Sequence, residues 1–240
     1  MKKDVGRSWK VFYFLFQKEL RLYFLGTSFY LVSAVLSGGL FLLFRFTYPS
    51  EKLNQETSIS ILWAVHLISS LFSLIASAEW EWESNAMRAV KLSGAEGYFV
   101  FLSKSIASFF SLTLLWVLEI FVWLVLFGSE NSSLLKSPLN QIFTAVVQML
   151  LAGAVASAGI SFLGQITSIL ALHSRFKHVL MFIVFFPVSI PLIIAASAYT
   201  RIAVSLKGLD GGFNFISLEL AFCFFFLAAG FVLYDVLWEE

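Results

Sequence analysis

The sequence predicts an all-α integral membrane protein with six transmembrane helices. Hydrophobic residues make up 59% of the 240 residues, and charged residues make up only 13%. Soluble domains carry about 25% charged residues, so half of the usual charge is missing. Six stretches of the chain are mostly apolar and about 20 residues or longer, which is the length that a helix needs to cross a membrane. They leave no room for a soluble domain.

The N-terminal segment, residues 1–21, is basic and precedes the first apolar stretch. One face of a helix can hold Lys10, Gln17, Lys18 and Arg21, but the apolar residues do not gather cleanly on the opposite face. We therefore predict an imperfectly amphipathic helix that lies in the inner membrane interface. A cytoplasmic extension of the first span is the alternative.

The predicted spans make residues 1–240 a single transmembrane domain. Small residues recur at helical spacing in the fourth span, as in Ala152, Ala156 and Gly159. They predict a face that packs closely on another helix, either within the chain or in a second copy of it. The fifth span contains Pro187 and Pro191, each of which removes a backbone donor, so a kinked helix is predicted. The spans cover about 22–46, 57–78, 99–127, 141–172, 179–200 and 213–237.

The Lys and Arg residues are distributed unevenly over the loops. Most of them lie in the N-terminal segment and around the loops that follow the second and fourth spans. The other side of the membrane receives only Arg45, Lys52, Lys136, Arg201 and Lys207. Because cytoplasmic loops are enriched in Lys and Arg, we predict a cytoplasmic N-terminus. Six spans then return the C-terminus to the cytoplasm.

A charged stretch, "AEWEWESNAMRAVKLSG", separates the second span from the third. In a helix over about 81–93, Glu81, Ser84, Arg88 and Lys91 form a polar stripe, whereas Trp82, Ala86, Ala89 and Val90 form an apolar one. Acidic residues lead and basic residues trail, as the helix dipole favours. We predict a short amphipathic helix on the cytoplasmic side. A loop helix that touches only lipid headgroups is the alternative.

Four segments carry a resemblance to a known family. They are "KELRLYF" (18–24), "AEWEWESNAMRAVKLSGAEGYFVFLSK" (78–104), "GAVASAGISFLGQIT" (153–167) and "FFPVSIPLIIAAS" (185–197). In this order and spacing the chain resembles the CcmB family, the permease subunit of the haem exporter ABC transporter of cytochrome c maturation. Gly94 departs from the family pattern, in which a proline is expected.

The resemblance implies a type-2 ABC exporter-like permease in the bacterial inner membrane, with an N-terminal interfacial helix and a cytoplasmic coupling helix. In such transporters, the helix after the second span fits into a groove of the ATPase subunit. The implied partners are that ABC ATPase, other cytochrome c maturation membrane subunits, a haem chaperone, membrane lipid and a second permease copy. The residues expected to dock on the ATPase are Glu81, Trp82, Glu83, Arg88, Val90 and Lys91.

Several motifs are missing from the sequence. Without G-x-x-x-x-G-K-[ST] the chain has no P-loop, so we expect a membrane subunit that is not an enzyme and an ATPase on a separate chain. Without C-x-x-C-H we expect no covalently attached haem, and no permanently bound cofactor or metal. Haem is then a transported or handled ligand. The net charge of +1 gives no indication of nucleic-acid binding.

Two polar residues inside the predicted spans are candidate functional residues. Glu119 is costly in lipid, so it either lies on a translocation or regulatory path or is protonated, snorkelling or hydrogen-bonded to a neighbouring helix. His66 either ligates haem iron through an imidazole nitrogen or makes a hydrogen bond between helices. Glu219, near one end of the sixth span, is expected to be interfacial.

Other functions remain open at this point. A type-2 ABC permease that exports a lipid, a glycan or a drug has the same general features. An intramembrane enzyme needs a clustered catalytic set such as H-E-x-x-H, which the sequence does not contain. A structural scaffold is the remaining alternative, and ATPase-dependent activity of the complex excludes it.

Overall fold

The computed structural model describes residues 5–24, 29–49, 53–84, 90–92, 95–128, 137–172, 174–205 and 212–239. Its long helices are α1 (Val5–Phe24), α2 (Phe29–Thr47), α3 (Gln55–Ser84), α5 (Gly97–Phe127), α7 (Leu139–Leu172), α8 (Lys177–Val204) and α9 (Phe213–Glu239). Of these, α2 to α9 are six helices long and apolar enough to cross a membrane. The predicted all-α fold with six membrane-spanning helices is confirmed.

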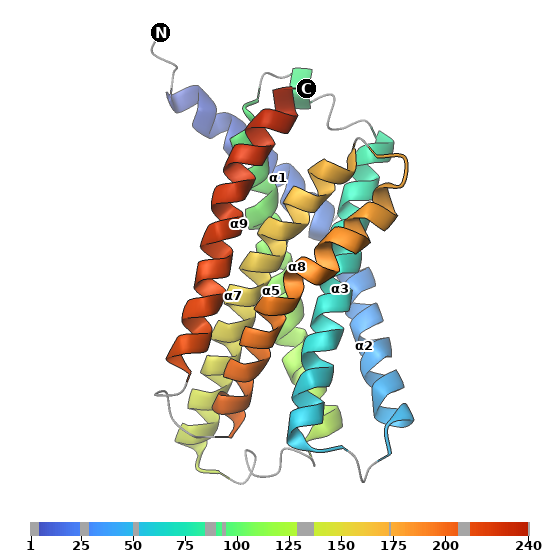
Figure 1. The fold of residues 1–240 in the computed structure, drawn as a ribbon, viewed down its shortest axis with the longest axis vertical. Helices are drawn as coiled ribbons and strands as arrows, with labels where there is room; N and C mark the ends of the chain where they lie inside the picture. The colour runs from blue at the N-terminus through green and yellow to red at the C-terminus, as the bar shows by residue number, and fades with distance from the viewer. Residues whose placement is uncertain are drawn as a thin grey trace.

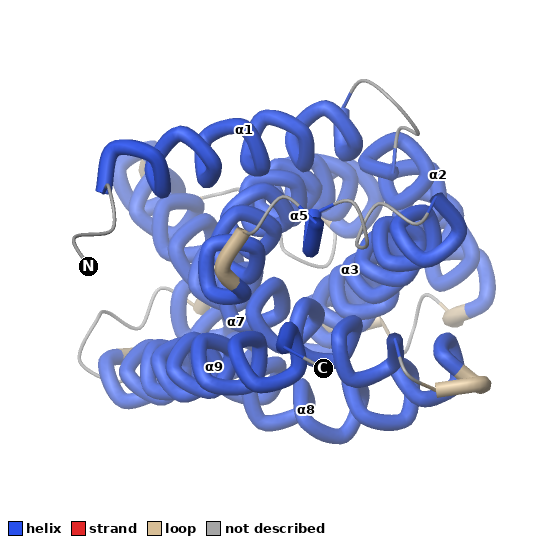
Figure 2. Tube along the Cα trace, turned by 90° about the horizontal axis from the view of Figure 1, so that it is seen from above, coloured by secondary structure: helices blue, strands red, loops and turns tan. Residues whose placement is uncertain are grey.

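The six spans form an upright bundle, and α1 lies obliquely at one end of it (Figure 1). The N-terminus and the C-terminus both lie at this end, as an even number of crossings requires. We call it the α1 end. Seen from above in Figure 2, α1 runs along one side of the bundle and α8 and α9 lie on the opposite side. Helices α5 and α7 lie between these two sides.

Helix α7 packs on α5, α8 and α9, so the small residues of its sequence face other helices of the same chain. A Cβ atom added at Gly153 would overlap the indole of Trp116, and one at Gly159 would lie 2.8 Å from Leu192 Cδ2. The sequence left open whether this face packs inside the chain or against a second copy. In the structure it packs inside the chain, because the closely approaching side chains come from α5 and α8.

Helix α1 packs on α5 through residues three and four positions apart. The rings of Phe12 and Phe99 lie 6.4 Å apart, and Tyr23 is 1% exposed. The predicted start of the first span at residue 22 is wrong, because α1 continues to Phe24 and α2 begins at Phe29. Leu22 belongs to α1 because it extends the buried face of that helix against Ala107 of α5.

Helix α3 does not end near residue 78 as predicted but continues to Ser84. The predicted separate helix over 81–93 is therefore wrong at its start. The reason is that Ser77, Ala78 and Glu81 continue the buried face of α3, since residues three and four apart share one side of a helix. Residues 90–92 are helical, whereas Arg88 lies outside the described residues.

Helix α8 contains both prolines in its interior and remains helical across them. In Figure 1 it runs obliquely near the α1 end and more upright towards its other end. A proline inside a helix removes one backbone hydrogen bond and pushes its ring against the preceding turn. The change in direction is therefore the one that Pro187 and Pro191 predict.

We predict that Gly153→Ala destabilises the bundle by about 1–3 kcal/mol, the usual cost of forcing extra atoms into a packed core. The added methyl group must displace Trp116, which is fully buried. Gly38→Ala is the matched control, because nothing lies within 4 Å of a Cβ atom at Gly38 in α2. Thermal unfolding midpoints of the purified proteins in detergent give the comparison. Equal midpoints for the two variants would contradict the packing of α7 on α5.

Candidate functional site

Four charged residues meet at the α1 end, and we call Lys18, Glu19, Glu81 and Lys104 the charge cluster. Lys18 Nζ donates to Glu19 Oε1 at 2.9 Å and to Glu81 Oε1 at 3.3 Å. Lys104 Nζ donates to the other carboxylate oxygen of Glu81. Glu19, Glu81 and Lys104 are nearly inaccessible to solvent. The cluster therefore links α1, α3 and α5 through ion pairs whose carboxylates are buried.

Two ammonium groups and two carboxylates make the cluster electrically neutral. Neutrality matters because a buried charge without a partner is strongly destabilising. Burial raises the pKa of the Glu19 carboxyl, and repulsion by Glu81 adds to this rise, whereas Lys104 and Lys18 oppose it. Lys18 also lies 5.9 Å from the centroid of the Trp80 ring, at a distance typical of cation–π contacts. Lys18 is thus held on two sides.

Glu19 explains why the amphipathic pattern of α1 is imperfect in the sequence. This acidic residue occupies the buried face of α1 and is 2% exposed. Its partner Lys18 precedes it in the chain, and Lys104 reaches the same cluster from α5. The buried carboxylate of Glu19 is therefore compensated by Lys18 of the same helix and by Lys104 of α5.

Trp82, the expected docking anchor, is half-buried between α3 and the start of α8. Lys177 Nζ lies 5.1 Å from the centroid of the Trp82 ring, and the ring of His178 lies 5.6 Å away at 70°. His178 Nε2 also faces Glu79 Oε1 at 3.3 Å. Trp82 thus joins α3 to α8 within the chain.

The remaining docking residues differ in how far they are accessible. Glu83 is exposed, whereas Glu81 is buried in the charge cluster, which corrects its expected place on a surface stripe. Val90 is partly buried and packs on the buried group around Tyr234. Leu92, which no pattern in the sequence singles out, is 83% exposed. Two residues apart in a helix are about 200° apart, so burial of Val90 turns Leu92 outwards.

A second site lies deep within the bundle. His66 Nδ1 of α3 and Glu119 Oε2 of α5 are 2.7 Å apart, and both residues are fully buried. His66 Nε2 lies 3.3 Å from the hydroxyl of Ser157 in α7. The structure therefore places both candidate residues in one contact between helices, which was one of the explanations left open for each. We call His66, Glu119 and Ser157 the core triad.

Aromatic rings enclose the core triad. The imidazole of His66 lies 4.9 Å from the Trp116 ring and 5.9 Å from the Trp63 ring. Trp63 Nε1 donates to Thr200 Oγ1 at 3.1 Å, and Trp116 Nε1 donates to the carbonyl oxygen of Met149 at 3.0 Å. Each indole thus packs edge to face with the imidazole of His66 and satisfies its N–H donor on another helix.

The geometry limits what the core triad can do chemically. Both nitrogens of His66 have partners, so iron ligation by this imidazole requires the loss of one of them. Glu119 Oε1 has no partner among the described residues, which leaves one acceptor position on the carboxyl group. The arrangement is suited to holding helices together and to holding a proton between Glu119 and His66.

Hydroxyl groups connect α5 and α7 between the charge cluster and the core triad. Ser108 Oγ donates to the carbonyl oxygen of Lys104 at 2.9 Å, and Ser161 Oγ donates to that of Ser105 at 2.6 Å. Gln165 Nε2 lies 3.4 Å from Ser108 Oγ. Polar contacts therefore continue from one site towards the other along the same helix pair.

Glu219, which is expected near the membrane interface, is fully buried in α9. It lies six residues from the start of α9, about 9 Å along the helix axis. Cys223 lies one turn further and donates from its thiol to the carbonyl oxygen of Val155 in α7 at 3.2 Å. Glu219 therefore shares the face of α9 that packs on the bundle. Neither of its carboxyl oxygens has a partner among the described residues.

Removal of one charge from the cluster should destabilise the folded protein more than removal of an oppositely charged pair. We predict that Lys104→Met destabilises the protein by about 3–5 kcal/mol, because Glu81 is left buried without its nearest cation. The double variant Lys104→Met, Glu81→Leu should recover much of this loss, since Lys18 and Glu19 remain as a neutral pair. Thermal unfolding midpoints in detergent measure both effects. A double variant no more stable than Lys104→Met would disprove the ion-pair explanation.

The core triad predicts energetic coupling between α3 and α5. His66→Leu and Glu119→Leu should each destabilise the protein, while the double variant should lose less than their sum, with a coupling energy of about 1–3 kcal/mol. Ser157→Ala is the control, because its contact at 3.3 Å is longer and weaker. The double-mutant cycle is measured by thermal unfolding of the purified chain. Additive losses would show that the contact contributes nothing.

Comparison with known protein families finds a family that matches this chain. A family model described as CcmB protein matches residues 10–221, which include most of α1 and all of α2 to α8. Comparison with curated proteins finds no match. The matched region contains the charge cluster and the core triad.

Proposed function

This chain belongs to the CcmB family, and we propose that it couples ATP hydrolysis by a separate ATPase subunit to haem export or to the release of a haem-loaded chaperone in cytochrome c maturation. The family is the membrane component of a haem exporter ABC system, so the chain is a multi-pass permease subunit and not itself the ATPase. The proposal concerns how a movement of the ATPase reaches the membrane core.

The charge cluster is the observation that carries this proposal. Glu81 lies in the last turn of α3, at the start of the segment that the family resemblance implies as the ATPase docking site. Its carboxylate is bonded to Lys104 of α5 and Lys18 of α1. Breaking a buried ion pair costs about 3–5 kcal/mol. A push on the end of α3 is therefore transmitted to α1 and α5 rather than absorbed by local bending.

The docking surface that we propose differs from the one predicted by the sequence. We infer that Leu92 supplies the apolar anchor, since it is the exposed large side chain in the described part of this segment. Glu83 is exposed near the N-terminal end of the segment and supplies a charge for the rim of the interface. Trp82 and Val90 support the segment from within by packing on α8 and on the group around Tyr234.

The distribution of charge supports a cytoplasmic α1 end. Basic side chains described at this end include Lys18, Arg21, Lys91, Arg175 and Lys177. At the opposite end, the helices carry Arg45 and Arg201. An excess of Lys and Arg is characteristic of cytoplasmic loops. We therefore propose that both termini and the docking segment face the cytoplasm of a bacterial cell, where ATP is available.

We predict that Leu92→Ala weakens binding of the ATPase subunit by about 2 kcal/mol, the loss typical of a buried interface anchor. Glu83→Ala should weaken it by about 1 kcal/mol or less, and in a salt-dependent way, as expected for a rim charge. Leu139→Ala is the matched control, because Leu139 is 85% exposed at the opposite end of the bundle. Co-purification of the ATPase from detergent-solubilised membranes gives the measurement.

Formation of c-type cytochromes in the same strains tests the cellular role. The Leu92→Ala strain should lose them while keeping a normal amount of the membrane subunit, whereas the Leu139→Ala strain should resemble the wild type. Wild-type recovery of the ATPase with Leu92→Ala across a salt series would reject this docking surface. Normal cytochromes after deletion of the whole chain would reject the proposed function.

A further inference from the structure

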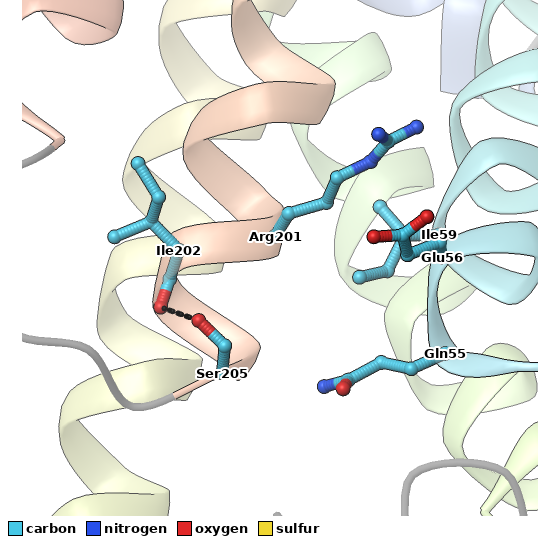
Figure 3. Close-up of a pocket in the computed structure, with 6 residues that line it drawn as sticks. All are labelled: Gln55, Glu56, Ile59, Arg201, Ile202 and Ser205. Atoms are coloured by element: carbon cyan, nitrogen blue, oxygen red, sulfur yellow. Dashed lines mark hydrogen bonds between the residues drawn. The ribbon is translucent and has the colours of Figure 1, made fainter.

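Two hollows lie along the seam between α3 and α8 at the end opposite α1, and Arg201 lines both of them. The first has a volume of about 180 Å³ and lies at the helix ends (Figure 3). The second has a volume of about 370 Å³ and extends further along the two helices, towards the α1 end. Together they reach the range of small-molecule sites, about 300–1,000 Å³. We call the two hollows the α3–α8 groove.

The mouth of the groove carries opposite charges on its two walls. In Figure 3, the guanidinium of Arg201 extends from α8 towards α3, on which Glu56 lies. Arg201 Nη2 donates to Ser60 Oγ at 3.1 Å, and among the described residues no ion pair joins it to Glu56. The amide nitrogen of Gln55 points into the same hollow and is buried without a partner among those residues. The mouth therefore offers one cation, one anion and an amide donor.

The deeper part of the groove is lined mainly by apolar side chains, among them Trp63, Leu67, Ile193 and Ile194. Trp63 and Leu67 follow Gln55, the first residue of α3, by eight and twelve positions, which places them about 12 and 18 Å further along the helix. The hydrocarbon half of a membrane is about 15 Å thick. Ile194 is 63% exposed, so the groove opens sideways on the face of the bundle that lipid covers.

We propose that the α3–α8 groove binds one phospholipid whose zwitterionic headgroup carries a primary ammonium, as in phosphatidylethanolamine. The phosphate lies on Arg201 and the Gln55 amide, and the ammonium donates to the Glu56 carboxylate. One acyl chain follows the apolar wall past Trp63. This goes beyond the proposed function, since neither the ATPase nor haem takes part.

Charge complementarity selects this headgroup over its alternatives. An anionic headgroup such as phosphatidylglycerol satisfies Arg201 but brings no cation to Glu56. A phosphatidylcholine headgroup has the same net charge but no N–H group, so it makes no hydrogen bond to a carboxylate. Only a headgroup that presents both phosphate and a hydrogen-bonding ammonium satisfies both walls with charge-assisted hydrogen bonds.

The proposed lipid lies against a side chain that belongs to the core of the bundle. Trp63 lines the groove, and its ring also packs on His66 and Trp116. Its indole nitrogen bonds to Thr200 of α8, the other wall of the groove. A bound acyl chain therefore fills the seam at the level of Trp63 and supports the contact between α3 and α8 there.

Lipid retention by the purified full-length chain tests the proposal. The chain is placed in bilayer discs of equal parts phosphatidylethanolamine, phosphatidylglycerol and phosphatidylcholine, and the lipids that stay bound are weighed by native mass spectrometry. The wild type should retain phosphatidylethanolamine preferentially. Arg201→Gln should lower this retention about five-fold, the scale of a solvent-accessible charged contact. Glu56→Gln should abolish the preference over phosphatidylcholine and phosphatidylglycerol.

Two further variants separate headgroup recognition from acyl-chain binding. Arg45→Gln removes a guanidinium from α2 at the same end of the bundle but outside the groove, and it should leave the lipid pattern unchanged. Ala198→Phe fills the apolar part of the groove and should lower retention of all three lipids without changing their order. Glu56→Gln and Ala198→Phe keep the test decisive if Arg201→Gln does not fold.

Three outcomes would overturn the proposal. The first is equal retention of the three phospholipids by the wild type. The second is an unchanged preference in both Arg201→Gln and Glu56→Gln. The third is efficient cross-linking of two copies through a cysteine introduced at Ile194, with no bound lipid, which would make the groove a face for self-association.

Discussion

The hydrogen bond between His66 and Glu119 is the contact on which the centre of the bundle depends. A carboxyl group in the middle of a membrane has no water to solvate it, so a neighbouring helix must supply its partner. His66 Nδ1 does so at 2.7 Å, and Ser157 approaches the other nitrogen of the same ring. One side chain thus determines how α3, α5 and α7 are rotated towards one another. Trp63 and Trp116 pack around this contact and extend it to α8 and α7.

The buried charges of the charge cluster, at the α1 end, also need partners from neighbouring helices. Lys104 and Glu81 are buried, so they must remain together, and Lys18 ties them to α1. Helices α1, α3 and α5 are therefore tied together at the end where the ATPase is proposed to dock. The seam between α3 and α8 is different, because Trp82 and Trp63 bridge it at two levels and the α3–α8 groove separates its walls near the opposite end.

Much of the fold follows from patterns that are local in the chain. Long uncharged stretches predict the six spans, because crossing the hydrocarbon core needs about 20 apolar residues. The small residues around Gly153 predict a close helix contact for an equally local reason, since they repeat on one face of a helix. Helix ends are less predictable. Leu22 and Glu81 lie within or beside apolar stretches, and only their burial against α5 shows that they belong to α1 and α3.

By itself, the sequence determined the fold class, the number of spans and the residues whose placement in a membrane is costly, because hydropathy and charge are properties of the residues themselves. Only the tertiary structure decided the partners of those residues. His66 and Glu119 are 53 positions apart, and Lys18 and Glu81 are 63 positions apart. Helical periodicity tells which face of a helix is buried, but not which helix covers that face. For the same reason, it could not show that Val90 turns inwards and leaves Leu92 exposed.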